Sequence, residues 1–119
     1  MIEKETWEVI VAYYKKFYGK TLTLRDKVKL EQSSEVLNFG EGCFISIGPN
    51  FDLFINEKNQ GGKWKIRSTI NTFLKNKIKQ FGYARIGIHE MNKKSLRLAN
   101  FFKFQEKFRK GSWIFLEVN

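Results

Sequence analysis

One segment of the sequence combines glycines and cations directly before a strongly amphipathic stretch. It consists of Gln60, Gly61, Gly62, Lys63, Trp64 and Lys65, and Arg67 adds a further positive charge. Backbone N–H groups at the start of a helix have no partner within the helix, and together with the helix dipole they attract anions. Residues 60–65 therefore indicate a phosphate-binding loop, with a plain connection between a strand and a helix as the alternative.

Other reactive side chains are few. The chain has one cysteine, Cys43, and one histidine, His89, so it forms no internal disulfide and we expect no metal site. Cys43 lies in an apolar run without a neighbour in sequence that would lower its pKa, which favours a buried strand residue over a nucleophile. Ser95, His89 and an aspartate do not have the spacing of a catalytic triad.

Local sequence signals mark where the helices and strands that carry these residues begin and end. Gly19 and Gly82 each follow an amphipathic stretch and suit the end of a helix. Thr23, with Asp26 three residues later, can cap a helix, and so can Asn92. We expect helices over residues 5–18, 23–30, 66–81 and 93–102, and strands over residues 36–39, 43–47, 51–55, 83–90, 104–108 and 113–118.

The third of these helices has the clearest pattern. Its apolar residues recur at helical spacing and predict one buried face. They are Ile66, Ile70, Phe73, Leu74, Ile78 and Phe81. Arg67, Lys75 and Lys79 fall largely on the other face.

The order of strand, loop, helix, strand, helix and hairpin over residues 43–118 resembles the GNAT superfamily of N-acetyltransferases. In that family a loop of pattern Gln/Arg-x-x-Gly-x-Gly/Ala holds the pyrophosphate of acetyl-CoA, and Gln60 matches its first position. A second family motif is Asn-x-x-Ala/Ser-x-x-Leu-Tyr-x-x-x-Gly-Phe. It is matched at the same spacings by Asn92, Ser95, Leu98 and Phe104.

The chain also departs from both motifs. Lys63 and Lys65 stand where the loop has its two glycines, and the two glycines of this chain come earlier. Ala99 stands where many members have a tyrosine that protonates the leaving thiolate, and Lys103 replaces the glycine of Gly-Phe. Residues 1–42 form a divergent helical part. In these respects the chain is similar to short GNAT-like proteins encoded by bacteriophages, which implies a host cytoplasm.

The resemblance implies an α/β (α+β) fold in a single domain over residues 1–119. Its sheet would be mixed and mainly antiparallel, flanked by helices, with a C-terminal β-hairpin. The implied activity is transfer of an acetyl group from acetyl-CoA, as co-substrate, to an amine on a small molecule or a protein. The implied cofactor contacts are Phe54, Ile55, Gln60, Gly61, Gly62, Lys63, Trp64, Lys65, Asn92 and Ser95.

Such an enzyme also needs a base for the acceptor amine. Asp52, Glu57 and His89 are the candidates, because each lies in or at the end of an expected strand near the proposed cleft. Histidine is the residue type that ordinarily titrates in the useful pH range, although a lone histidine is more often structural.

Charge leaves other functions open. Residues 1–57 hold 7 basic and 9 acidic side chains, whereas residues 58–119 hold 15 basic and 3 acidic ones. This uneven distribution of positive charge favours a negatively charged partner, such as nucleic acid, a phosphorylated cofactor or an acidic surface. The alternative is a lysine-rich face that only contacts solvent. The alternatives to an enzyme are an inactive GNAT-like binding or structural protein and a nucleic-acid-binding module. The module would use Lys63, Lys65, Arg67, Lys75, Lys79, Lys93, Lys94, Arg97 and Lys103.

The sequence also bears on location and assembly. No apolar run approaches the length of a membrane span, and the first residues do not resemble a signal peptide. We therefore expect a cytoplasmic protein without a membrane partner. It would be a monomer, or a homodimer paired through Trp113 or Phe115 on an open terminal strand, although the same pattern also suits an ordinary core.

Overall fold

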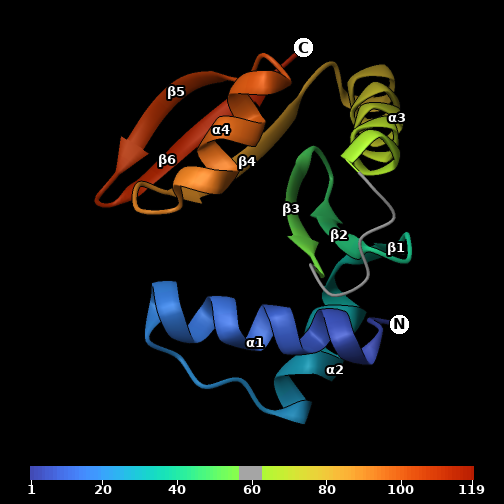
Figure 1. The fold of residues 1–119 in the computed structure, drawn as a ribbon, viewed down its shortest axis with the longest axis vertical. Helices are drawn as coiled ribbons and strands as arrows, with labels where there is room; N and C mark the ends of the chain where they lie inside the picture. The colour runs from blue at the N-terminus through green and yellow to red at the C-terminus, as the bar shows by residue number, and fades with distance from the viewer. Residues whose placement is uncertain (57–62) are drawn as a thin grey trace. The chain divides into compact units, whose positions relative to one another are not determined.

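A computed structural model describes residues 1–56 and 63–119 of the chain, with the backbone alone for residues 63 and 64 (Figure 1). The helices are α1 (Lys4–Tyr18), α2 (Leu24–Ser33), α3 (Lys63–Phe81) and α4 (Lys93–Phe101). The strands are β1 (Glu35–Asn38), β2 (Gly42–Ile47), β3 (Asn50–Ile55), β4 (Ala84–His89), β5 (Gln105–Lys110) and β6 (Trp113–Val118). Among the described residues, no helix is both long enough and apolar enough to span a bilayer.

The helix ends follow the local signals of the sequence. Gly19 ends α1 in the left-handed region, with φ of 64°, and Gly82 follows α3 with φ of 86°. At the start of α2, the Thr23 hydroxyl accepts a hydrogen bond from the Asp26 N–H, and the Asp26 carboxylate accepts one from the Thr23 N–H. The helix then continues to Ser33, three residues beyond its expected end.

The strands form one sheet in the order β1-β2-β3-β4-β6-β5. The pairs β1–β2, β4–β6 and β5–β6 are antiparallel, while β3 and β4 are parallel. The expected fold class is therefore confirmed: a mixed, mainly antiparallel sheet with helices and a C-terminal hairpin. Of the two readings of Trp113 and Phe115, the open edge is excluded, because β6 pairs with β4 along its whole length and leaves β5 at the edge.

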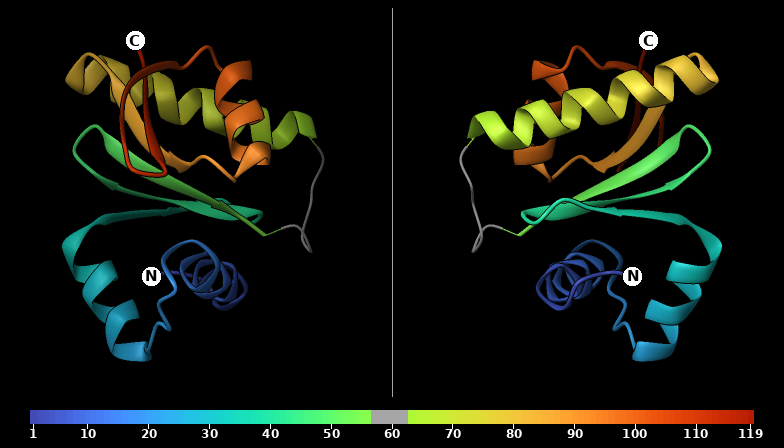
Figure 2. Two further views of the ribbon diagram at one scale, coloured as in Figure 1. Left: turned by 90° about the vertical axis from the view of Figure 1, so that its left-hand side faces the viewer. Right: turned by 90° about the vertical axis from the view of Figure 1, so that its right-hand side faces the viewer.

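The chain divides into two compact units, and its expected single domain stays a prediction. The first unit contains residues 1–47 and 52–69, and the second contains residues 48–51 and 70–119. In the first unit, α1 and α2 lie on the same side of β2 (Figure 2). The core of this unit contains Ile2, just before α1, and side chains of α1, β2 and β3: Trp7, Ile10, Cys43, Ile45 and Phe54.

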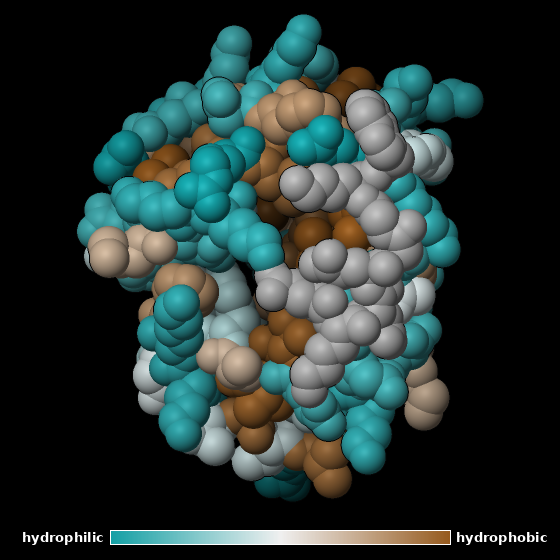
Figure 3. Space-filling model, in the orientation of Figure 1, coloured by the Kyte–Doolittle hydropathy of each residue, from teal (hydrophilic) through white to brown (hydrophobic). Residues whose placement is uncertain are grey.

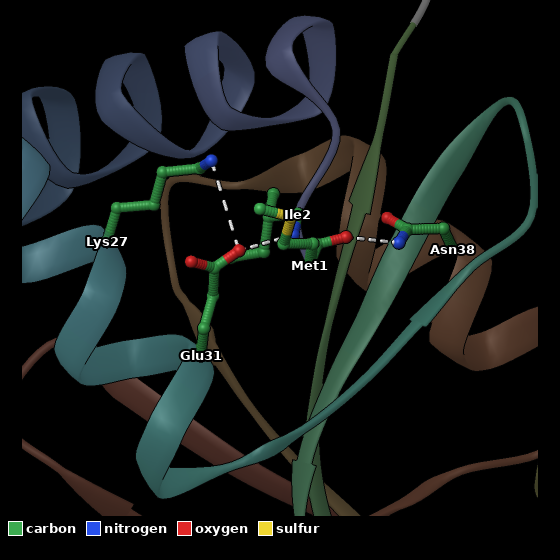
Figure 4. A network of polar contacts seen from close by, with 5 residues as sticks. All are labelled: Met1, Ile2, Lys27, Glu31 and Asn38. Carbon is green, nitrogen blue, oxygen red and sulfur yellow. Dashed lines mark hydrogen bonds and ion pairs between the residues drawn. The ribbon is translucent and has the colours of Figure 1, made fainter.

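A polar network holds the start of α1 in place (Figure 4). The Ile2 N–H donates to Oε2 of Glu31 on α2 at 2.6 Å, and Lys27 forms an ion pair with the same carboxylate oxygen at 3.9 Å. The Asn38 side chain, on β1, donates to the Met1 carbonyl oxygen at 2.5 Å. These contacts connect the beginning of α1 with both α2 and β1.

In the second unit, α4 packs on one face of β4 and β6 (Figure 1). The buried contacts are Ile88, Ala99, Ile114 and Leu116. The start of α4 is fixed by the Asn92 side chain, whose Oδ1 accepts a hydrogen bond from the Ser95 N–H at 3.3 Å. The outward side of α4 is largely hydrophilic (Figure 3), because Lys93, Lys94 and Arg97 are exposed there.

The face of α3 differs from the expected one in the second unit. Phe73 and Leu74 are buried as expected, but Phe81 is 39% exposed and Lys77 is only 5% exposed. The Lys77 ammonium lies 5.6 Å from the ring centre of Phe73 and 5.3 Å from that of Phe81. A lysine can occupy such a position because its four methylene groups are apolar and its cation is attracted to aromatic faces.

Candidate functional site

The strongest candidate for acid–base chemistry is Asp52, one of the three predicted bases. It lies within β3 and is half-buried. Burial raises the pKa of its carboxyl group from 3.8 to about 6, because removal from water disfavours the charged form. A group with such a pKa is charged at neutral pH and still accepts a proton readily, as a general base must.

The charge of this carboxyl group acts on three tyrosines of α1. They are Tyr13, Tyr14 and Tyr18, which we call the tyrosine cluster. Burial, followed by the negative charge of Asp52, raises the pKa of all three phenols, that of Tyr14 to about 12. The phenols therefore stay neutral and keep their protons at physiological pH, which leaves Asp52 as the group that titrates.

The rings of α1 form a continuous aromatic layer. The Tyr14 and Tyr18 rings stack at 5.0 Å with an interplanar angle of 24°, and Tyr13 lies 5.0 Å from Phe17. The Tyr13 ring also meets Phe54 of β3 edge-on at 5.2 Å. Residues two apart in a strand point to the same face, so Asp52 and Phe54 both face α1.

The approach of β2 to β3 requires a glycine at position 42. A Cβ atom on Gly42 would lie 2.1 Å from the carbonyl oxygen of Phe54, far inside van der Waals contact. Gly42 thus lets the backbone that carries Phe54 pack against β2. Together with the network at the start of α1, this fixes both elements that supply the site.

The predicted pyrophosphate loop lies largely outside the described residues. Glu57, Gln60, Gly61 and Gly62 belong to this part, and only the backbone is described for Lys63 and Trp64, at the start of α3.

Lys65 is described in full and forms an ion pair. Its ammonium lies 2.9 Å from Oε1 of Glu41, whose side chain is 5% exposed while that of Lys65 is 64% exposed. The hydrogen bond from Lys65 lowers the pKa of the Glu41 carboxyl group. A phosphate at this position would have to share Lys65 with Glu41.

The remaining predicted residues lie in the second unit, around the start of α4. Nδ1 of His89 accepts a hydrogen bond from the Met91 N–H at 3.1 Å, and the ring meets Trp113 edge-on at 5.2 Å. Asn92 and Ser95 are joined by the capping hydrogen bond described above. The structure therefore gives Asn92 a capping role at its side-chain oxygen and gives His89 a fixed ring orientation.

Cys43 is fully buried in β2, as the sequence favours. Burial raises the pKa of its thiol to about 12, so the nucleophilic thiolate does not form near neutral pH. Among the described residues, no group of three or more histidine, cysteine, aspartate or glutamate side chains has the arrangement of a metal site.

The structure brings together Asp52, Phe54 and the tyrosine cluster in the first unit. The sequence predicts Asp52 and Phe54 as site residues but not the tyrosines, whose spacing also suits an ordinary apolar helix face. The one available signal is the number of hydroxyl-bearing rings within six residues of α1.

Comparisons with known proteins bear on the fold. No protein-family model matches the chain, and no curated protein matches it. The chain is similar to a solved structure, the crystal structure of PH1933 from Pyrococcus horikoshii OT3, with a TM-score of 0.62 at 18% sequence identity. The similarity covers 98% of this chain and 92% of that chain, so it extends over the whole α+β fold.

Proposed function

We propose that the chain is an N-acetyltransferase that moves an acetyl group from acetyl-CoA to an amine, with Asp52 as the general base. The observation that carries the proposal is the position of Asp52: a half-buried carboxyl group of raised pKa on β3, beside neutral phenols. Lys65 and the start of α3 would contact the cofactor phosphates, as the resemblance implies.

The cofactor part of the proposal assigns pantetheine to the end of β3, a strand that pairs with β4 at its start. These strands are parallel, and in the described residues their register contains one pair, Asn50 opposite Arg85. The Arg85 N–H donates to the Pro49 carbonyl oxygen at 2.9 Å, next to that pair. Backbone groups of Phe54 and Ile55, further along β3, would bind the amide groups of pantetheine, as the resemblance implies.

The chemistry of the acceptor follows from the charges around Asp52. An amine is an ammonium ion at neutral pH, and a carboxylate next to aromatic faces attracts such a cation. The ammonium ion loses two protons on the way to the amide. Asp52 takes the first, which frees the nitrogen lone pair to attack the thioester carbonyl carbon. The C–N bond forms, the C–S bond breaks, and the second proton of the nitrogen passes to the departing thiolate of CoA, which leaves as the free thiol.

The test measures binding and turnover separately. Acetyl-CoA binding is measured by calorimetry, and release of the CoA thiol is followed with a panel of primary amines. We expect Asp52→Asn to lower kcat by about 100-fold or more with an unchanged Kd for acetyl-CoA, as expected when a general base is removed. Glu8→Gln, which changes an exposed carboxylate of α1 in the same way, is the matched control and should leave both values unchanged.

Two results would contradict the proposal in different ways. Lack of acetyl-CoA binding at millimolar concentration excludes the cofactor. Binding without thiol release for any amine supports instead a GNAT-like protein that binds the cofactor but is inactive.

A further inference from the structure

We infer a binding surface for single-stranded nucleic acid on the second unit, on the face of β4, β6 and β5 opposite α4. Register pairs place its side chains on the same face: Arg85 with Glu117, His89 with Trp113, and Phe115 with Phe108. We call this set, together with Lys110 opposite Trp113, the aromatic face. The proposal does not depend on the acetyltransferase activity.

The centre of the aromatic face is a column of planar groups. The rings of Phe108 and Phe115 stack at 4.7 Å with an interplanar angle of 12°. The Arg85 guanidinium carbon lies 5.6 Å from the centre of the Phe108 ring. Phe115 in turn lies on Gly87, where a Cβ atom would stand 3.0 Å from its ring.

Nucleobases bind to such a column. Aromatic rings and guanidinium planes both stack on bases, and a sheet face that presents them holds bases that have left a duplex. Phe108 is accessible, with 45% of its surface exposed, because it lies on the edge strand β5. A double helix keeps its bases stacked on one another, so this mode of binding selects single strands.

The charge of the second unit complements a polyanion. Its residues include 11 lysines and arginines against 3 acidic side chains. Two of these acids are already paired within the unit, Glu117 with Arg85 and Glu106 with Arg109 at 3.0 Å.

Lysines flank the column along the exposed edge. Lys107 and Lys110 both lie on β5, every residue of which is exposed. A phosphate backbone that follows β5 would meet these cations while its bases reach Phe108. The surface thus accounts for basic residues beyond those that one acetyl-CoA requires.

The experiment measures fluorescence anisotropy of a labelled oligonucleotide of about 12 nucleotides in low salt. We expect Phe108→Leu, which keeps an apolar side chain but removes the aromatic plane, to weaken binding by about tenfold, the range for loss of one stacked base. Phe108→Tyr should bind like the unchanged protein. Phe101→Ala, an exposed phenylalanine on α4 in the same unit, is the control and should also bind normally.

Further ligands in the same experiment distinguish binding by stacking from binding by charge alone. We expect the same sequence as a duplex, and a polyglutamate of equal length, to bind at least about tenfold more weakly than the single strand. Saturating acetyl-CoA should not displace the oligonucleotide. Equal affinity for duplex or polyglutamate, or unchanged binding by Phe108→Leu, would overturn the proposal. Loss of acetyltransferase activity alone would leave it intact.

Discussion

Gly42 and Phe54 lie so close together that a single added carbon on Gly42 would come within 2.1 Å of the Phe54 carbonyl oxygen. The clash involves backbone, which cannot rotate away as a flexible side chain can. The Phe54 ring is in contact with Tyr13, and Asp52 is two residues before Phe54. The geometry of the candidate site therefore depends on a glycine that belongs to neither the base nor the tyrosine cluster.

Gly42→Ala should destabilise the protein strongly. We expect a loss of about 3 kcal/mol or more in the free energy of unfolding, since overpacking against rigid backbone is the expensive case. Urea denaturation measures the loss. The control is Gly40→Ala, where a Cβ meets nothing within 4 Å but φ is +84°, and there we expect a smaller loss of about 1 kcal/mol. Equal losses at the two positions would contradict the close contact.

Asp52→Asn should make the protein more stable above about pH 6. The folded-state pKa of Asp52 is raised from 3.8 to about 6, so the folded chain binds the proton more tightly than the unfolded chain. Stability is then highest below the unfolded-state pKa and falls as the pH rises through this window. We expect Asp52→Asn to gain about 2 kcal/mol at neutral pH, a value below the full conversion because the group is half-buried.

The same substitution should change little at about pH 4, where Asp52 is largely protonated in the folded state. Denaturation at neutral pH and at about pH 4 measures the difference in unfolding free energy between Asp52→Asn and the unchanged protein, with Glu8→Gln as the control. A gain that does not depend on pH would mean that the substitution acts through packing. In the active protein, kcat/KM should rise with an apparent pKa of about 6, and the rise should disappear in Asp52→Asn.

Glu41→Gln should tighten binding of acetyl-CoA. The ion pair with Glu41 holds the Lys65 ammonium, and removal of the carboxylate releases it for a phosphate. We expect the Kd to fall by about two- to fivefold, the scale of a partly exposed ion pair, whereas Lys65→Gln should raise it. Calorimetry measures both, and Glu35→Gln on β1 is the control. An unchanged Kd in Glu41→Gln and Lys65→Gln would remove Lys65 from the cofactor site.

Thr23→Ala should destabilise the chain by about 1 kcal/mol, because the first backbone N–H groups of α2 lose their capping oxygen. Thr21→Ala, an exposed threonine two residues earlier, should have almost no effect.

The hydrogen bonds to Thr23 lower the pKa of the Asp26 carboxyl group. Stability from the cap is therefore present above the ordinary aspartate pKa and is lost as the pH falls below it. Denaturation curves of both variants at acidic and neutral pH test this.

Local signals account for much of the fold that the sequence predicts. Three helix-end signals each act within a few residues, so the local sequence alone reveals them. They are the capping box at Thr23 and Asp26, the left-handed Gly19 and the Asn92 cap. The burial of Lys77 is different. A pattern of apolar and charged residues places a lysine outside, whereas this lysine is buried and its ammonium lies near the rings of Phe73 and Phe81.

The candidate site illustrates the same limit. Asp52 can be selected from the sequence as a carboxylate on a strand. Its raised pKa comes from burial, which the sequence does not show. The tyrosine cluster lies more than thirty residues earlier in the sequence and reaches Asp52 only through tertiary packing. The position of β6 between β4 and β5 likewise depends on pairing between distant segments.

The edge strand β5 has a consequence for the behaviour of the protein at high concentration. A free strand edge is a template for another strand and so for aggregation. In β5 the register shifts between Glu106 and Phe108, which makes the edge irregular, and Lys107 and Lys110 place positive charge along it. Two such edges repel each other and do not match in register. This edge therefore resists growth into extended intermolecular sheets, even though β5 is exposed along its whole length.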